Sequence, residues 1–297
     1  MKARVLVAWL LVLLGSGPSS ASSTAGTARA DSTVTLVVPL PGEVQELVLR
    51  DGTRAAGRIE RVEGGRVLFR TTAGAEIAVE ASQIAAIRSL TGELVDGEYR
   101  RPDPNPTRLF FGPTARSVPA GTGYLGVFEI LLPFVQVGLT DRISLGGGTP
   151  LIFGEETAHP FWLTPKVQVL HTGHTQAAVG AFWLANVEDG TGGVVYGVVT
   201  RGRVDAAITV AAGYALASDM DDVEGGAVLM LGGERRVSRG LKLITENYLW
   251  NGGGLASAGI RLLGERLSAD LGLVAPLGAG VVFAFPVVNF VWRFGGD

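Results

Sequence analysis

The second half of the 297-residue sequence alternates between apolar residues and small or polar ones. From Val204 to Leu216 every second residue is apolar, and the residues between them are Asp, Ala, Thr and Gly. The same pattern recurs at 135–140, 163–169, 256–262 and 267–273. Successive side chains of a β-strand point to opposite faces, so a period of two predicts strands, each with one wholly apolar face.

The composition of the other face indicates the surroundings of these strands. It consists mostly of Gly, Ala, Ser and Thr, with single charges. A face of a soluble β-protein that meets water is normally rich in Lys and Glu. Small side chains instead suit a narrow barrel interior, and the apolar face would then contact lipid. Because a closed barrel leaves no backbone edge in a bilayer, we expect an all-β chain whose residues 121–297 form an antiparallel transmembrane β-barrel.

About twelve strands are expected in this barrel, an even number as in bacterial single-chain barrels. They are predicted near residues 122–131, 133–140, 143–153, 161–171, 175–186, 193–200, 204–217, 226–236, 240–250, 255–263, 267–276 and 282–294.

The connections between these strands indicate which way the barrel faces. Tight turns such as 140–142 and 264–266 alternate with longer loops such as 218–224, and most basic residues lie near the tight turns while acids fill the long loops. Short turns face the periplasm in bacterial barrels. The last strand ends in 289–294, Asn-Phe-Val-Trp-Arg-Phe, which resembles the terminal aromatic signal of outer-membrane barrels. The expected location is the bacterial outer membrane, with its lipid and the barrel-assembly machinery as partners.

Some charged residues fall on the interior face of the predicted strands. They are Lys166, Asp205, Glu246, Arg261, Asp270 and Arg293. In a low-dielectric interior such charges must pair or stay hydrated. They would either fix the strand register or line a solute path.

Catalytic and cofactor-binding motifs are missing from the sequence. No Gly-x-Ser-x-Gly elbow or His-x-Ser pair occurs, and no carboxylate accompanies the paired histidines His171 and His174. The net charge is −3, basic residues form no block, and there is no cysteine. We therefore predict no enzyme, no cofactor or metal, and no nucleic-acid partner.

The first thirty residues have the pattern of a secretory signal peptide. Lys2 and Arg4 precede an apolar run over 5–14, which is too short for a permanent membrane helix. Small residues ending at Ala21 or at Ala30 offer two cleavage sites. Residues 1–30 are therefore predicted to direct export.

Residues 31–99 are predicted to form a small periplasmic β-domain, a meander of four strands separated by Asp-Gly and Gly-Gly turns. Its pattern includes Leu49–Thr53, Gly57–Ile59, Val67–Leu68, Gly74–Ile77, Ile84 and Ile87. This pattern resembles the Sm-like or SH3-like barrels of many secreted bacterial proteins. The resemblance implies an adaptor that meets a periplasmic protein partner.

Residues 100–120 contain five prolines and are predicted to be a stiff, extended linker whose apolar middle, 108–111, docks onto another surface. The stretch 105–116, followed by 138–148, resembles uncharacterised bacterial envelope proteins with a C-terminal barrel. That resemblance implies a location and a fold, and no chemistry.

Two functions fit these expectations best: a passive pore, and a scaffold that presents the periplasmic module. A secreted soluble barrel that binds an apolar ligand inside is the first alternative, and an outer-membrane hydrolase is the second.

Overall fold

The structure is a computed structural model that describes residues 43–90, 92–95, 98–151, 160–187, 190–218, 223–278 and 283–295. These residues fall into two compact units, one up to Pro102 and the other from Asp103 onward. The predicted signal peptide, 1–30, lies outside the described residues. Within the described ranges, no helix has the length and hydropathy needed to cross a membrane.

The first unit contains a five-stranded antiparallel sheet in the order β4-β3-β2-β1-β5. Its strands are β1 (Val44–Leu49), β2 (Arg54–Glu63), β3 (Arg66–Thr71), β4 (Glu76–Glu80) and β5 (Ile84–Leu90), and a separate hairpin joins β6 (Glu93–Val95) to β7 (Glu98–Arg100). Gly52, Gly65 and Gly74 have positive φ in the turns, which glycine adopts without steric cost. The sheet has one strand more than the four predicted, and its likeness to Sm or SH3 barrels stays a prediction.

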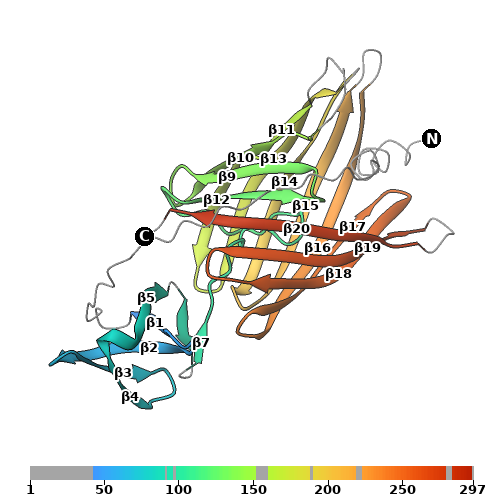
Figure 1. The fold of residues 1–297 in the computed structure, drawn as a ribbon. Helices are drawn as coiled ribbons and strands as arrows, with labels where there is room; N and C mark the ends of the chain where they lie inside the picture. Colours follow the sequence, from blue (N-terminus) through green and yellow to red (C-terminus); the bar gives the residue numbers. More distant parts are fainter. Residues whose placement is uncertain are drawn as a thin grey trace. The chain divides into compact units, whose positions relative to one another are not determined.

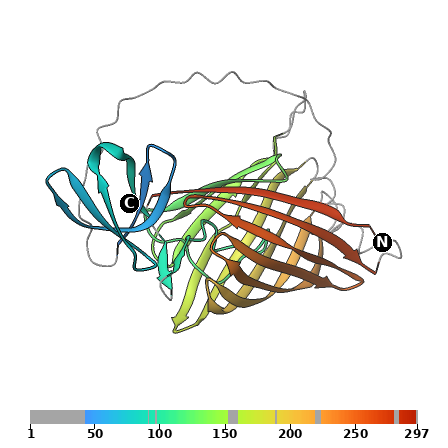
Figure 2. The same ribbon diagram turned by 60° about the horizontal axis from the view of Figure 1, so that its bottom comes forward.

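The second unit is a closed antiparallel β-barrel (Figures 1 and 2). Its strands are β8 (Gly123–Phe128), β9 (Leu132–Gly138), β10 (Ile143–Gly148), β11 (Phe161–Leu163), β12 (Lys166–Thr172), β13 (Thr175–Val187), β14 (Gly190–Arg203), β15 (Ala206–Ser218), β16 (Val223–Ser238), β17 (Leu241–Trp250), β18 (Gly253–Leu263), β19 (Leu267–Leu277) and β20 (Phe285–Phe294). Consecutive strands pair with each other except β11 and β12, which both pair with β10 and β13, and β20 pairs with β8 to close the ring.

Two of these segments make one interrupted strand. Both β11 and β12 pair with β10 and with β13, and Pro165, which has no N–H, lies between them. The carbonyl of Pro165 still accepts a hydrogen bond from Ala181 N at 3.0 Å. The barrel therefore has twelve strands, and the predicted fold class is confirmed.

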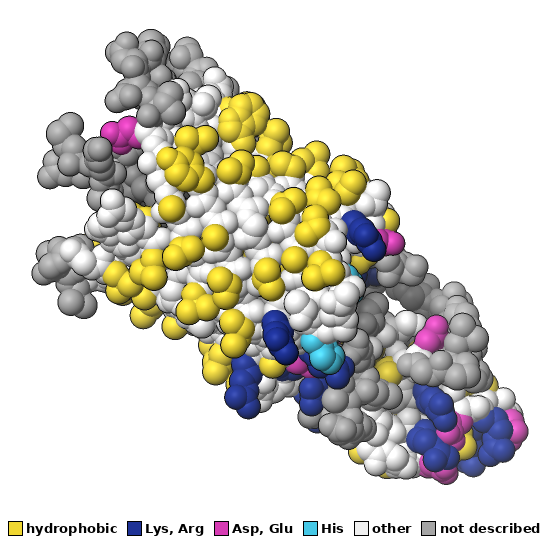
Figure 3. All heavy atoms as spheres, turned by 180° about the vertical axis from the view of Figure 1, so that it is seen from behind, with side chains coloured by type: hydrophobic (Ala, Val, Ile, Leu, Met, Phe, Trp, Pro, Cys, Tyr) yellow, Lys and Arg dark blue, Asp and Glu magenta, His cyan; other side chains and the backbone are white. Residues whose placement is uncertain are grey.

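The wall of the barrel has its apolar face on the outside (Figure 3). In β15 the side chain of Ile208 is 62% exposed and that of its neighbour Thr209 only 1%. In β19 Leu271 is 41% exposed and Asp270 only 2%. The soluble alternative required the Val, Leu and Ile face to line the interior, so the structure contradicts it.

Candidate functional site: a plug inside the barrel

Residues 103–120, here called the plug, are largely buried inside the barrel. Leu109, Phe110, Thr114 and Ala115 have no exposed surface. From Asp103 onward the segment therefore lies inside the barrel, whereas an extended linker with only its apolar middle docked was expected. The prolines keep this segment out of the strand ladder, but several of its backbone polar groups bond to the inner wall, and Phe110 and Phe111 pack against it.

The plug folds back on itself. Leu109 N donates to Gly112 O at 2.9 Å, and Thr114 N donates to Thr107 O at 2.9 Å. Beyond this reversal, Ala120 bridges to Gly138 at the tight-turn end of β9, and β8 begins shortly afterwards. The segment thus turns at 109–112, the tip of the plug, and returns to the end of the barrel that carries the tight turns.

One carboxylate of the wall holds the tip. Glu246 Oε2 accepts backbone N–H bonds from Phe110 at 2.8 Å, Phe111 at 3.1 Å and Gly112 at 3.0 Å. Its other oxygen accepts a bond from the Tyr248 hydroxyl at 2.8 Å. Hydrogen bonds to an ionised acceptor are the strong ones, so Glu246 fixes three consecutive backbone donors that would otherwise be buried without a partner.

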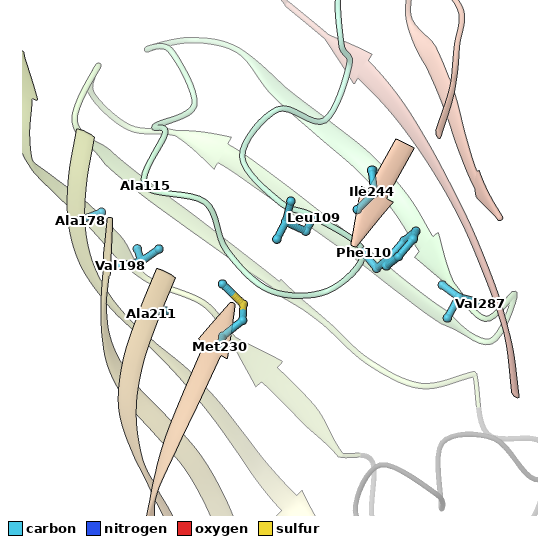
Figure 4. Packing of buried hydrophobic residues seen from close by; sticks show 9 residues of the cluster. All are labelled: Leu109, Phe110, Ala115, Ala178, Val198, Ala211, Met230, Ile244 and Val287. Atoms are coloured by element: carbon cyan, nitrogen blue, oxygen red, sulfur yellow. The ribbon is translucent and has the colours of Figure 1, made fainter. Parts of the chain in front are cut away.

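Apolar side chains of the tip and the wall form one cluster (Figure 4). Its members are Leu109, Phe110, Ala115, Ala178, Val198, Ala211, Met230, Ile244 and Val287. A Cβ at Gly112 would lie 2.3 Å from Met230 Sδ and 2.7 Å from the Tyr248 hydroxyl. A larger residue at this position would therefore force the Met230 and Tyr248 side chains to move.

Arg261 of β18 ties the base of the tip to the wall. Its guanidinium makes a two-pronged contact with Asp270, at 2.6 Å and 3.0 Å. It also donates to the carbonyls of Asn105 and Leu109, each at 2.6 Å. Because Arg261 is fully buried and bonded to both wall and plug, it joins two parts of the chain that are more than 150 residues apart.

A second charged group lies where the plug enters. The buried Lys242 ammonium contacts Asp103 at 2.7 Å and also pairs with Glu234, which in turn binds Arg116 of the plug. Burial disfavours the charged form of Asp103, but Lys242 and Arg261 outweigh it and hold the pKa of this carboxyl below its usual range. The two ends of the plug are therefore held by ion pairs at the same side of the wall.

A third group of contacts holds the returning arm. Lys166 Nζ donates to Thr114 O at 3.0 Å, and Gln168 Nε2 donates to Ala115 O at 2.8 Å. On the other side, Ala115 N donates to Thr200 Oγ1 at 2.9 Å. The arm is thus bonded through its backbone to β12 and β14.

The structure brings most of the predicted interior charges to the plug. Lys166, Glu246 and Arg261 bond to it directly, and Asp270 acts through Arg261. Their role in a solute path stays a prediction.

Two predicted residues lie elsewhere. Asp205 was expected on a strand, but β15 begins one residue later, so Asp205 sits in the turn and accepts a bond from Arg236. Arg293 is half-buried near the end of β20, and its backbone N–H donates to Arg266 O at 2.7 Å.

Five charged residues of the lumen were not predicted: Lys242 and Glu234 on the wall, and Asp103, Arg108 and Arg116 in the plug. Lys242 precedes Glu246 by four residues on the same strand, so the period of two already placed it on the interior face. The plug residues carry no such periodic signal.

Among known proteins, no family model matches the chain, and the search of curated proteins returned no match. Solved structures of OmpT, an outer membrane protein of Vibrio cholerae, are similar in fold. A mutant lacking loop L8 is 12% identical, with 85% of this chain and 97% of that one covered and a TM-score of 0.37. OmpT expressed in the outer membrane is 12% identical over 85% and 94%, with a TM-score of 0.36. The trimer form folded in vitro is 13% identical over 85% and 96%, with a TM-score of 0.33.

These matches correct one prediction. The chain was predicted not to be an enzyme, because its sequence shows no catalytic motif. OmpT proteins are among its structural matches, and a shared barrel fold gives no ground for excluding a catalytic activity. That prediction is therefore withdrawn.

Proposed function

We propose that this chain is an outer-membrane β-barrel closed by its own plug, and that it anchors the β1–β5 domain at the membrane. The main support is the buried hydrogen-bond network between plug and wall. In it Glu246 accepts bonds from three backbone N–H groups of the plug, and Arg261 donates to two of its backbone carbonyls. A lumen that the chain itself fills favours the scaffold over the passive pore.

The outer surface supports the membrane location. Its apolar side chains are exposed around the wall, while Lys166, Glu246, Arg261 and Asp270 are buried inside and the exposed arginines lie near the tight-turn end. Burying apolar surface is worth roughly 25 cal/mol per Å², so such a wall favours lipid over water. Leu229, Leu231 and Leu249 are each more than half exposed, which a water-soluble wall would not favour.

The ends of the barrel support the proposed sidedness. Gly123 at the start of β8 pairs with Phe294 at the end of β20, and Val137 opposite Gly123 leads into the tight turn before Ile143. Both chain ends of the barrel thus lie on the tight-turn side, which faces the periplasm in bacterial barrels. We accordingly place the β1–β5 domain in the periplasm, with a protein partner there, and assign export to residues 1–30 and assembly to the barrel-assembly machinery.

Conductance in planar bilayers tests the closure. Full-length protein should insert with little conductance, whereas a variant lacking residues 104–115 should open a channel through the emptied lumen. Leu243→Ala, which trims a lipid-facing side chain of β17, is the matched control and should stay closed. Equal, steady conductance of the full-length protein and the deletion variant would overturn the plug as a closure. Recovery of the full-length protein as a monomer in buffer without detergent would overturn the membrane location.

A further inference from the structure

Three arginines gather on the outside of the barrel wall near its tight-turn end. Arg201 and Arg203 belong to β14, and Arg235 belongs to β16. All three are exposed, and they share their faces with the exposed Val199 and Leu231, so they point away from the lumen.

The strand register brings these arginines together. Arg203 pairs with Ala206 of β15, and Ala206 pairs in turn with Arg235. Two strand spacings separate the two arginines, roughly 10 Å at the backbone, which long side chains bridge readily. Arg201 stands in the next outward row beside Ile208. Ala206, a small residue, lies between Arg203 and Arg235 in the register.

The neighbouring acids do not neutralise this cluster. Asp205 is bonded to Arg236, and Glu234 faces the lumen, where it binds Lys242 and Arg116. In the part of the chain that the structure describes, no ion pair joins a carboxylate to Arg201, Arg203 or Arg235. The cluster therefore presents three positive charges outward.

The cluster adjoins the apolar wall. Ile208, Val210 and Val199 are 62%, 50% and 47% exposed and follow the arginines on the same outer face. Figure 3 shows hydrophobic side chains over the barrel wall and Lys and Arg side chains gathered at one end of it. A ligand that fits both parts has an anionic head and an apolar tail.

We propose that Arg201, Arg203 and Arg235 bind the headgroup of an anionic phospholipid whose acyl chains lie along Ile208 and Val210. A guanidinium group can donate two parallel hydrogen bonds to the oxygens of one phosphate. A phosphate-bearing headgroup is therefore bound by directed hydrogen bonds as well as by charge attraction. The site rests on the proposed membrane location, since only a bilayer places lipid headgroups beside the tight-turn end of the wall. A protein or a nucleic acid that bound the arginines would not contact Ile208 and Val210, which face the acyl chains, so a lipid uses more of this surface.

Native mass spectrometry of the full-length protein tests the site. The protein is prepared in micelles that contain equal amounts of phosphatidylglycerol and phosphatidylcholine with identical acyl chains, and the retained lipids are counted. We expect preferential retention of phosphatidylglycerol. The variant R201Q/R203Q/R235Q should lose about two orders of magnitude of that preference, because each of the three arginines near an anionic lipid surface is worth roughly fivefold.

The control is R54Q/R58Q/R61Q, which removes the same charge from exposed positions of β2 and should leave the preference intact. A shift in gel mobility between unboiled and boiled samples checks that each variant is folded. Equal retention of both lipids by the unmodified protein, or an unchanged preference in the folded triple variant, would overturn the site while the membrane location stands. Failure of the unmodified protein to enter micelles at all would instead overturn the membrane location.

Discussion

Replacing Glu246 with alanine should release the plug. The substitution leaves the backbone N–H groups of Phe110, Phe111 and Gly112 without their acceptor in a buried site. A buried donor without a partner costs ~1–3 kcal/mol, so three donors cost ~3–9 kcal/mol. Water that enters the vacated space reduces this cost, which makes the lower end the better expectation. About 3 kcal/mol raises the undocked fraction of the plug roughly 100-fold.

Thiol labelling measures this fraction. The chain has no cysteine, so Ala115→Cys introduces a single thiol at a position with no exposed surface. A water-soluble thiol reagent should label it slowly in the parent protein and much faster in the Glu246→Ala background. Glu246→Gln keeps one acceptor oxygen and should fall between the two.

Leu243→Ala serves as the control for labelling as well, because Leu243 lies on the same strand and faces outward. Labelling should be unchanged in this background. If Glu246→Ala labelled no faster than the Leu243→Ala control, Glu246 would not be what holds the tip, and the apolar cluster alone would have to hold it.

The remaining predictions concern the ion pairs, the packing of the tip and the direction of the wall. Arg261→Met should destabilise the fold by ~3–5 kcal/mol in urea titrations, because it strands the buried Asp270 carboxylate; a loss below 1 kcal/mol would show that Asp270 needs no partner. Gly112→Ala should lower stability by ~1–3 kcal/mol through overpacking, and adding Met230→Ala should restore part of it; no rescue would place the clash elsewhere. Because Asp103 has a lowered pKa, its contribution is complete above about pH 4 and fades only below; the labelling rate at position 115, divided by the rate of the unfolded chain at the same pH to remove the titration of the thiol itself, should therefore be equal at pH 7 and pH 5, and a higher ratio at pH 5 would contradict this. Leu271→Cys should react with a lipophilic probe in the bilayer and resist a water-soluble one, and the reverse preference would refute the lipid-facing wall.

The strands were predictable because each carries a local, repeating signal. The predicted ranges overlap every barrel strand, including the interrupted one at Phe161–Thr172, and the period-two alternation in five of them showed which face is apolar. The ends were less well predicted where glycines cluster. Residues 190–192 and 223–225 were left outside the predicted strands, yet they belong to β14 and β16. Glycine marks turns in most contexts, but a barrel wall tolerates it where neighbouring strands approach closely.

The plug was missed because its sequence signal is negative. The five prolines of 100–120 predict that this segment is not part of a β-sheet, because proline has no N–H to donate to a neighbouring strand. They do not predict where the segment lies. The apolar middle, 108–111, did indicate docking, and the barrel interior was already expected to be narrow and lined with small residues. What the sequence could not show is that those small side chains leave room for a second piece of the same chain.

Contacts between wall residues and contacts between wall and plug also differ in how well the sequence predicts them. Arg261 and Asp270 stand directly opposite each other across the turn at 264–266, so counting outward from that turn pairs them from sequence alone. Glu246 and the Phe110 amide are separated by 136 residues, and no local rule connects them. Strand register is therefore set by short hairpins that form independently of the plug, whereas the plug's partners exist only once the ring has closed. It follows that a barrel without residues 104–115 should still close with Arg261 opposite Asp270. A deletion variant that failed to fold, rather than folding open, would show that the plug is needed to assemble the ring.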